Sequence, residues 1–169
     1  MSLNTAHADH GVLIHAGECI ILFSDNVSVE FYGNDQPEFK GTKTGRMYLT
    51  THRMIYNSKT NSDALRSFSF PFIALQDVTV EQPMFGANYI KGKVRAQPNG
   101  NYIGEVKFKL TFKSGGAIEF GQAMSANKRT AHLMVKASQA RCRPNPQSPG
   151  ALVTLLTNRN TILLENSII

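Results

Sequence analysis

Hydrophobic and polar residues alternate with a period of two along much of the first 120 residues. Val27, Val29 and Phe31 alternate with polar neighbours, and residues 18–23 form an almost continuous apolar run. Alternation is typical of a half-buried strand, and a short apolar run is consistent with a fully buried one. Asp25 and Asn26 predict a turn between these two strands. Further strands are predicted at residues 46–49, 53–57, 67–72, 73–80, 89–97, 105–112 and 117–120.

The clearest hairpin pairs residues 89–97 with residues 105–112, across a turn that contains Asn99 and Gly100. The apolar residues of each strand share one parity, so they turn together toward the core. The basic residues share the other parity and are predicted to form one exposed face of five cations: Lys91, Lys93, Arg95, Lys107 and Lys109. With that turn, the predicted cross-strand pairs are Lys93 with Lys107, Lys91 with Lys109 and Arg95 with Glu105.

Two interpretations of this basic face remain open on the sequence. Like charges placed directly opposite each other are destabilising, so the face is a candidate site for an anionic ligand. Phosphoinositide headgroups, an acidic peptide and nucleic acid phosphates share that chemistry. The alternative is a solvated charged surface that protects a hairpin from aggregation. A second candidate group for an anionic ligand lies around a glycine-containing loop and consists of Lys40, Lys43 and Arg46.

After Gly121 the hydrophobic period changes to that of a helix. Met124, Leu133 and Met134 follow a 3.6-residue repeat, and prolines at 144 and 146 predict the end of a helix over residues 122–141. Strands followed by one helix predict an α+β fold, in which the helix plugs the open end of a curved antiparallel sheet. The expected organisation is a flexible segment at 1–16, one domain at 17–142 and a proline-containing tail at 143–169. The tail either packs on the domain as a further helix or stays unpacked.

Charge is distributed unevenly along the 169 residues. Residues 1–90 hold 6 Lys/Arg and 9 Asp/Glu, whereas residues 91–113 hold 6 Lys/Arg and a single acid. A general nucleic-acid binder is more often basic throughout, so no specific nucleic acid binding is expected. No apolar run approaches the roughly 20 residues of a membrane-spanning helix, and no secretory signal is expected. The two cysteines favour free thiols over a disulfide, and hence a cytoplasmic or nuclear protein.

Motifs for catalysis are missing from the sequence. It contains no Gly-x-Ser-x-Gly, His-Glu-x-x-His or phosphate-binding loop pattern. His7, His10 and His15 lie near Asp9, but their spacing does not match a metal site. We therefore expect no enzyme, no metal and no cofactor.

Residues 45–56, Gly-Arg-Met-Tyr-Leu-Thr-Thr-His-Arg-Met-Ile-Tyr, resemble the signature of GRAM domains. Further runs at 39–43, 82–92 and 109–124 narrow the resemblance to the WW domain-binding protein 2 family, which includes a postacrosomal sheath relative. The resemblance extends over residues 11–124 and 135–139. It implies a pleckstrin-homology-like (GRAM) barrel of two antiparallel sheets, capped by one C-terminal helix.

The same resemblance implies a non-enzymatic adaptor and transcriptional coactivator in signalling, found in cytoplasm and nucleus. In the family, Pro-Pro-x-Tyr motifs in a proline-rich tail dock into WW domains, and transcription factors are further partners. This chain contains no Pro-Pro-x-Tyr, and no tyrosine follows Tyr102. WW domains are therefore not expected to bind it. The alternative function is a phosphoinositide- or anionic-membrane-binding module that uses the hairpin at 89–112.

Overall fold

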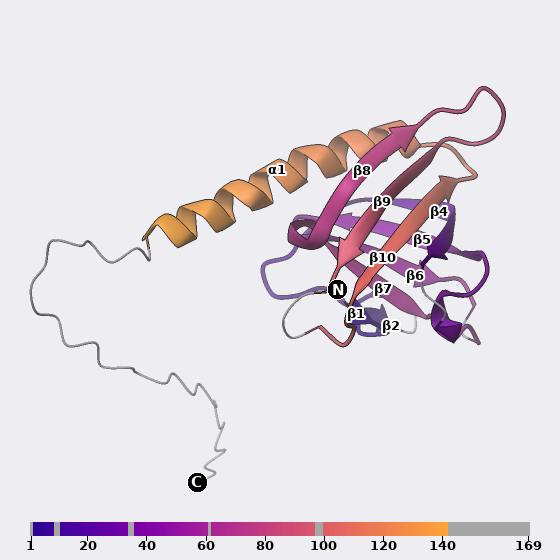
Figure 1. The fold of residues 1–169 in the computed structure, drawn as a ribbon, viewed down its shortest axis with the longest axis horizontal. Helices are drawn as coiled ribbons and strands as arrows, with labels where there is room; N and C mark the ends of the chain where they lie inside the picture. Colours follow the sequence, from indigo (N-terminus) through magenta and orange to yellow (C-terminus); the bar gives the residue numbers. More distant parts are fainter. Residues whose placement is uncertain (1, 9–10, 34–35, 61, 97–99, 142–169) are drawn as a thin grey trace, which may run out of the picture.

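The structure is a computed structural model that describes residues 2–8, 11–33, 36–60, 62–96 and 100–141. It consists of ten strands, two short 3₁₀ helices and one α-helix (Figure 1). The elements are β1 (Ser2–Leu3), β2 (His7–Ala8), β3 (Gly11–Val12), β4 (Ile20–Tyr32), η1 (Pro37–Phe39), β5 (Lys43–Thr50), β6 (Arg53–Ser58), β7 (Ser67–Pro71), η2 (Phe72–Ala74), β8 (Leu75–Glu81), β9 (Tyr89–Arg95), β10 (Glu105–Phe112) and α1 (Ala117–Arg141).

Eight strands form one antiparallel sheet in the order β1-β7-β6-β5-β4-β10-β9-β8. The 13-residue strand β4 pairs with β5 on one side and with β10 on the other. The sheet folds over along this strand, so that β8, β9 and β10 form one layer across β5, β6 and β7 (Figure 1). The predicted order of antiparallel strands followed by one helix is confirmed.

A bulge in β4 replaces the turn predicted at Asp25 and Asn26. The pairing of β4 with β5 shifts register between Ser24 and Val27, and Asn26 has a φ of 54°. An asparagine tolerates this left-handed conformation, and a bulge bends and twists its strand without ending it. The two separate strands that the sequence predicted are therefore one bent strand.

Aromatic side chains from both layers fill the core. Phe31 of β4 lies 4.8 Å from Phe39 and 5.2 Å from Phe68 between ring centroids. Phe70 of β7 contacts Phe108 of β10 at 4.8 Å, which joins the two layers directly. These rings are buried and mostly tilted or edge-on, the arrangement that aromatic pairs prefer.

The helix α1 begins earlier than predicted and buries only its first turns. Residues 117–120, predicted as a strand, form its start, and Ala117, Phe120 and Met124 are buried in the core. Beyond these turns the helix extends past the sheet (Figure 1). Leu133 and Met134 are exposed for this reason, so the apolar face predicted for the second half of the helix does not pack.

The first 16 residues, where the sequence indicated no regular structure, contribute three short strands. Strand β1 pairs with the sheet edge at β7, and β2 pairs with β3. Cys19 is exposed and has a free thiol, whereas Cys142 and the proline-containing tail lie outside the described residues. Among the described residues, no helix is both long and apolar enough to cross a membrane.

Candidate functional site

The basic face has the register that the sequence predicted. In the pairing of β9 with β10, Lys93 lies opposite Lys107 and Lys91 lies opposite Lys109. The apolar residues between them, such as Val106 and Phe108, are buried in the core. All five predicted cations therefore project from the same side of one layer, the side that faces solvent. The predicted turn itself falls partly outside the described residues.

Acidic side chains neutralise three of the five cations. Lys91 pairs with Glu81 at 3.0 Å, and Lys93 pairs with Asp77 at 2.9 Å. Hydrogen bonding to the lysines lowers the pKa of both carboxyls, and the same bonds raise the pKa of the lysines. The third pair, Arg95 with Glu105 at 2.9 Å, is the one that the sequence predicted.

The two acids on β8 were missed by sequence reasoning. Asp77 has a φ of 49° at a register shift between Gln76 and Thr79. This bulge changes the alternation along β8, so parity alone does not show which residues reach β9. One signal could have indicated these partners: Asp77 and Glu81 both lie in the predicted strand that immediately precedes the basic hairpin.

Two lysines of the basic face have no acidic ion-pair partner among the described residues. They are Lys107 and Lys109, both on β10. The Lys109 ammonium lies over the ring of Tyr89, 4.7 Å from its centroid. Glu30 of β4 is paired directly opposite Lys109 of β10. The hydrogen bond from Tyr32 lowers the pKa of the Glu30 carboxyl most, and the charge of Lys109 lowers it further.

A shallow hollow of about 430 Å³ opens among these side chains. Its lining combines four lysines and two tyrosines with one acid, which is the partner of Lys93: Lys91, Lys93, Lys107, Lys109, Tyr32, Tyr89 and Asp77, besides Gly92 and Phe108. Such a lining suits an anionic group with some apolar area, such as a lipid headgroup or a phosphorylated side chain.

The second basic group is not part of this face. Lys43 lies opposite Val29, whose side chain is buried, whereas Lys109 lies opposite Glu30. Successive strand residues point to opposite faces, so Lys43 projects from the other side of the sheet. Lys40 is exposed directly after η1.

Arg46, the third member of that group, has other partners. It pairs with Asp25 of the β4 bulge through an Nη2–Oδ2 contact of 3.0 Å, and its guanidinium lies 4.8 Å from the ring centroid of Phe23. The structure therefore does not bring the second group to the basic face.

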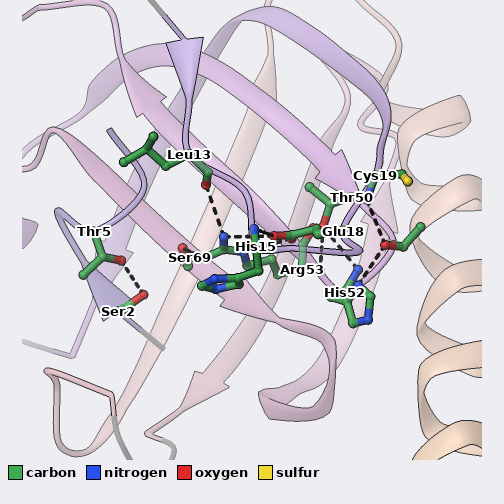
Figure 2. A network of polar contacts seen from close by, with 11 residues as sticks. Ser2, Thr5, Leu13, His15, Glu18, Cys19, Thr50, His52, Arg53 and Ser69 are labelled. Atoms are coloured by element: carbon green, nitrogen blue, oxygen red, sulfur yellow. Dashed lines mark hydrogen bonds and ion pairs between the residues drawn. The ribbon is translucent and has the colours of Figure 1, made fainter. Parts of the chain in front are cut away.

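A buried ion pair ties the N-terminal segment to the sheet (Figure 2). Arg53 of β6 donates to both carboxylate oxygens of Glu18 at 3.0 Å. It also donates to the hydroxyl of Ser69 at 3.0 Å and to the carbonyl of Leu13 at 3.2 Å. We call this group of contacts the Arg53 clasp. It gives Arg53, an arginine of the GRAM-like run at residues 45–56, a structural role.

Both oxygens of the Glu18 carboxylate accept hydrogen bonds. Besides Arg53, the Thr50 hydroxyl donates to it at 2.6 Å and the His15 N–H at 2.9 Å. Burial alone would raise the pKa of this carboxyl, but these hydrogen bonds outweigh burial and lower the pKa from 4.5 to about 2.

This lowered pKa predicts a specific acid sensitivity. A carboxyl with a depressed folded-state pKa stabilises the fold above its unfolded-state value and loses that contribution as pH falls toward the folded-state value. Between about pH 5 and pH 2 the free energy of unfolding should fall by about 3 kcal/mol through Glu18. Urea unfolding across this range would measure it. Glu18→Gln should show a flatter dependence, and equal slopes in both proteins would contradict the assignment.

No group of three or more potential metal ligands occurs among the described residues. The polar side-chain contacts among the described residues are ion pairs and hydrogen bonds, including one of 2.8 Å between the Thr51 hydroxyl and the His52 ring. None of them unites a nucleophile, a base and an orienting group in the described ranges.

The fold is of the pleckstrin-homology-like class. The N-terminal PH domain of Vps36 superposes with a TM-score of 0.54 over 76% of this chain and 90% of that domain, at 16% sequence identity. At that identity the likeness concerns the fold alone. The GRAM domain model matches residues 7–129, and the chain belongs to the GRAM domain family.

Among its relatives are proteins named for WW domain binding. WW domain-binding protein 2 of Homo sapiens is 48% identical over 129 residues, 73% of this chain and 48% of the relative. Postacrosomal sheath WW domain-binding protein of Homo sapiens is 40% identical over 151 residues, which cover 86% of this chain and 46% of that relative. The chain spans about half the length of these two relatives. A UPF0664 stress-induced protein of Schizosaccharomyces pombe is 32% identical over 73% of this chain and 74% of its own length.

Proposed function

We propose that this chain is a non-enzymatic adaptor that works through protein contacts made by its GRAM domain, in transcriptional coactivation and signalling in cytoplasm and nucleus. The observation that carries the proposal is the 48% identity to WW domain-binding protein 2 over 129 residues, 73% of this chain. The described residues also form no metal cluster.

Affinity capture from cells tests the adaptor role. The full chain and a chain truncated after Pro149 should retain the same protein partners, because the domain carries the contacts. Loss of all partners on truncation would move the function to the tail. Absence of any stoichiometric partner for both chains would overturn the adaptor proposal.

WW domains should not bind this chain, because docking requires the Pro-Pro-x-Tyr tyrosine that it lacks. Isothermal titration with a WW domain should show no heat of binding. The chain offers a matched control: the double substitution Ser148→Pro and Ala151→Tyr creates one Pro-Pro-x-Tyr and should restore binding. A low-micromolar affinity of the unsubstituted chain would contradict the prediction and indicate a second docking motif.

A second candidate function is binding to a phosphoinositide or another anionic membrane surface through the basic face. It is favoured by the lysine-lined hollow, where Lys107 and Lys109 carry no acidic ion pair in the part of the chain that is described. Vesicle flotation at low salt tests it. Lys107→Glu with Lys109→Glu should weaken binding about tenfold or more, since each cation near an anionic surface contributes about 1 kcal/mol.

The matched control carries the same change of charge outside the basic face, in the second basic group, as Lys40→Glu with Lys43→Glu. It should retain most of the binding, and added salt should weaken binding of every variant. Equal losses in the two double variants would show that total charge, and not the basic face, governs binding. No flotation of the unsubstituted chain would overturn the membrane function.

A further inference from the structure

The loop of residues 82–88, between β8 and β9, carries two apolar side chains in almost full contact with solvent. Met84 is 94% exposed and Phe85 is 90% exposed. Pro83 precedes them and Gly86, with a φ of 101°, follows them. Proline fixes its φ angle, and glycine readily adopts the left-handed backbone conformation. Residues that favour turns therefore flank both ends of this short apolar segment.

This loop protrudes from one end of the molecule. Asn88, the last residue of the loop, is held by a hydrogen bond of 3.2 Å, in which its carbonyl accepts from the N–H of Phe112. Figure 1 shows the loop extending beyond the ends of β8 and β9, near the turn that leads into α1. The apolar pair therefore sits on a convex tip and not in a groove. A convex apolar tip is buried only when it enters another phase or another molecule's pocket.

The surroundings of this tip are cationic and aromatic. Lys113 directly follows β10, and Lys109 lies within that strand opposite Glu30 of β4. Neither lysine has an acidic ion-pair partner among the described residues. Lys91 and Glu81 pair with each other and cancel. Tyr89 begins β9 directly after the loop, half-buried, with the Lys109 ammonium over its ring.

We propose that Met84 and Phe85 insert into the boundary between headgroups and acyl chains of an anionic membrane. Tyr89 then lies at headgroup level, where amphipathic rings accumulate, and Lys109 and Lys113 contact lipid phosphates. Apolar side chains flanked by cations match the layered chemistry of such a surface. The inference rests on the membrane function proposed above, and it specifies which element enters the bilayer.

The chain supplies a matched control for this tip. Ile103 is also exposed, at 92%, but it lies in the connection between β9 and β10 at the opposite end of these strands. The full chain would be floated with vesicles of phosphatidylserine and phosphatidylcholine, and with phosphatidylcholine alone. Met84→Ser with Phe85→Ser should reduce binding to the anionic vesicles roughly tenfold or more. Ile103→Ser should bind like the unsubstituted chain.

A second readout reports insertion directly. The chain contains no tryptophan, so Phe85→Trp places a single reporter at the tip. Its emission should shift to the blue on mixing with anionic vesicles, whereas Ile103→Trp should not respond.

Three outcomes are distinguishable. No binding by the unsubstituted chain overturns both the membrane function and the insertion. Binding that the Lys107 and Lys109 variant abolishes, but that the serine variant retains with no blue shift, overturns the insertion and leaves the membrane function. No shift with vesicles, but a shift on adding a purified protein captured as a partner, assigns the tip to protein docking and also overturns the insertion.

Discussion

Replacing Arg53 with alanine should lower the free energy of unfolding by about 3–5 kcal/mol. Arg53 and Glu18 are buried together, with only 8% and 1% of their side chains exposed. Removing one partner of such a pair leaves the other charge desolvated and uncompensated, which costs about that much. The change also removes the bonds from Arg53 to Leu13 and Ser69. Chemical denaturation at neutral pH would measure the loss.

Arg46 is the control for this prediction. It too is an arginine in an ion pair next to β6, but it and Asp25 are 44% and 50% exposed. Exposed pairs contribute about 0–1 kcal/mol, so Arg46→Ala should have little effect. If the two variants were equally stable, the Arg53 clasp would not hold the N-terminal segment as described.

Gly45→Ala should lower the free energy of unfolding by about 1–3 kcal/mol, and by more if the strands cannot adjust. Gly45 lies in β5 opposite Ser58, and a Cβ on it would stand 2.1 Å from the carbonyl oxygen of Asn57 and 2.8 Å from the Tyr56 ring. The first of these neighbours is backbone, so the strands themselves must separate. Such a shift would also disturb the bond from the Asn57 amide to the Gly11 carbonyl.

Gly11→Ala is the control, because it replaces a glycine at a position where the added methyl group has room. A Cβ at Gly11 meets no atom within 4 Å, and this residue also lies in a short strand. Thermal unfolding should find the Gly11 variant close to the unsubstituted protein and the Gly45 variant far below it. A Gly45 variant of normal stability would show that β5 and β6 separate more easily than the sheet register indicates.

The hairpin at 89–112 was predicted in register because two independent signals agreed. Alternation fixed which residues share a face, and an Asn-Gly turn fixed which residues face each other. Lys93 opposite Lys107 followed from these signals alone, and the structure confirms it. The order of antiparallel strands before one helix was predictable for a similar reason, since each element carries its own period.

Other features depend on contacts distant in sequence and were not predictable. Asn26 looks like turn chemistry, but pairing with strands on both sides keeps β4 continuous through a bulge. Asp77 reaches Lys93 only because of a second bulge. The helical period around Leu133 gave no information on where the sheet ends. The exposure of the Leu133 side chain could therefore be seen only in the structure.

The length of α1 separates the two ends of this protein. A helix of 25 residues, at 1.5 Å per residue, spans about 37 Å from Ala117 to Arg141. It starts beside the apolar tip and runs away from it along β8 (Figure 1). Arg141, the last residue that the structure describes, therefore lies about 37 Å along the helix from the turn that follows β10. A molecule bound at one end of the described structure would thus leave the other end uncovered, unless it were long enough to follow the whole helix.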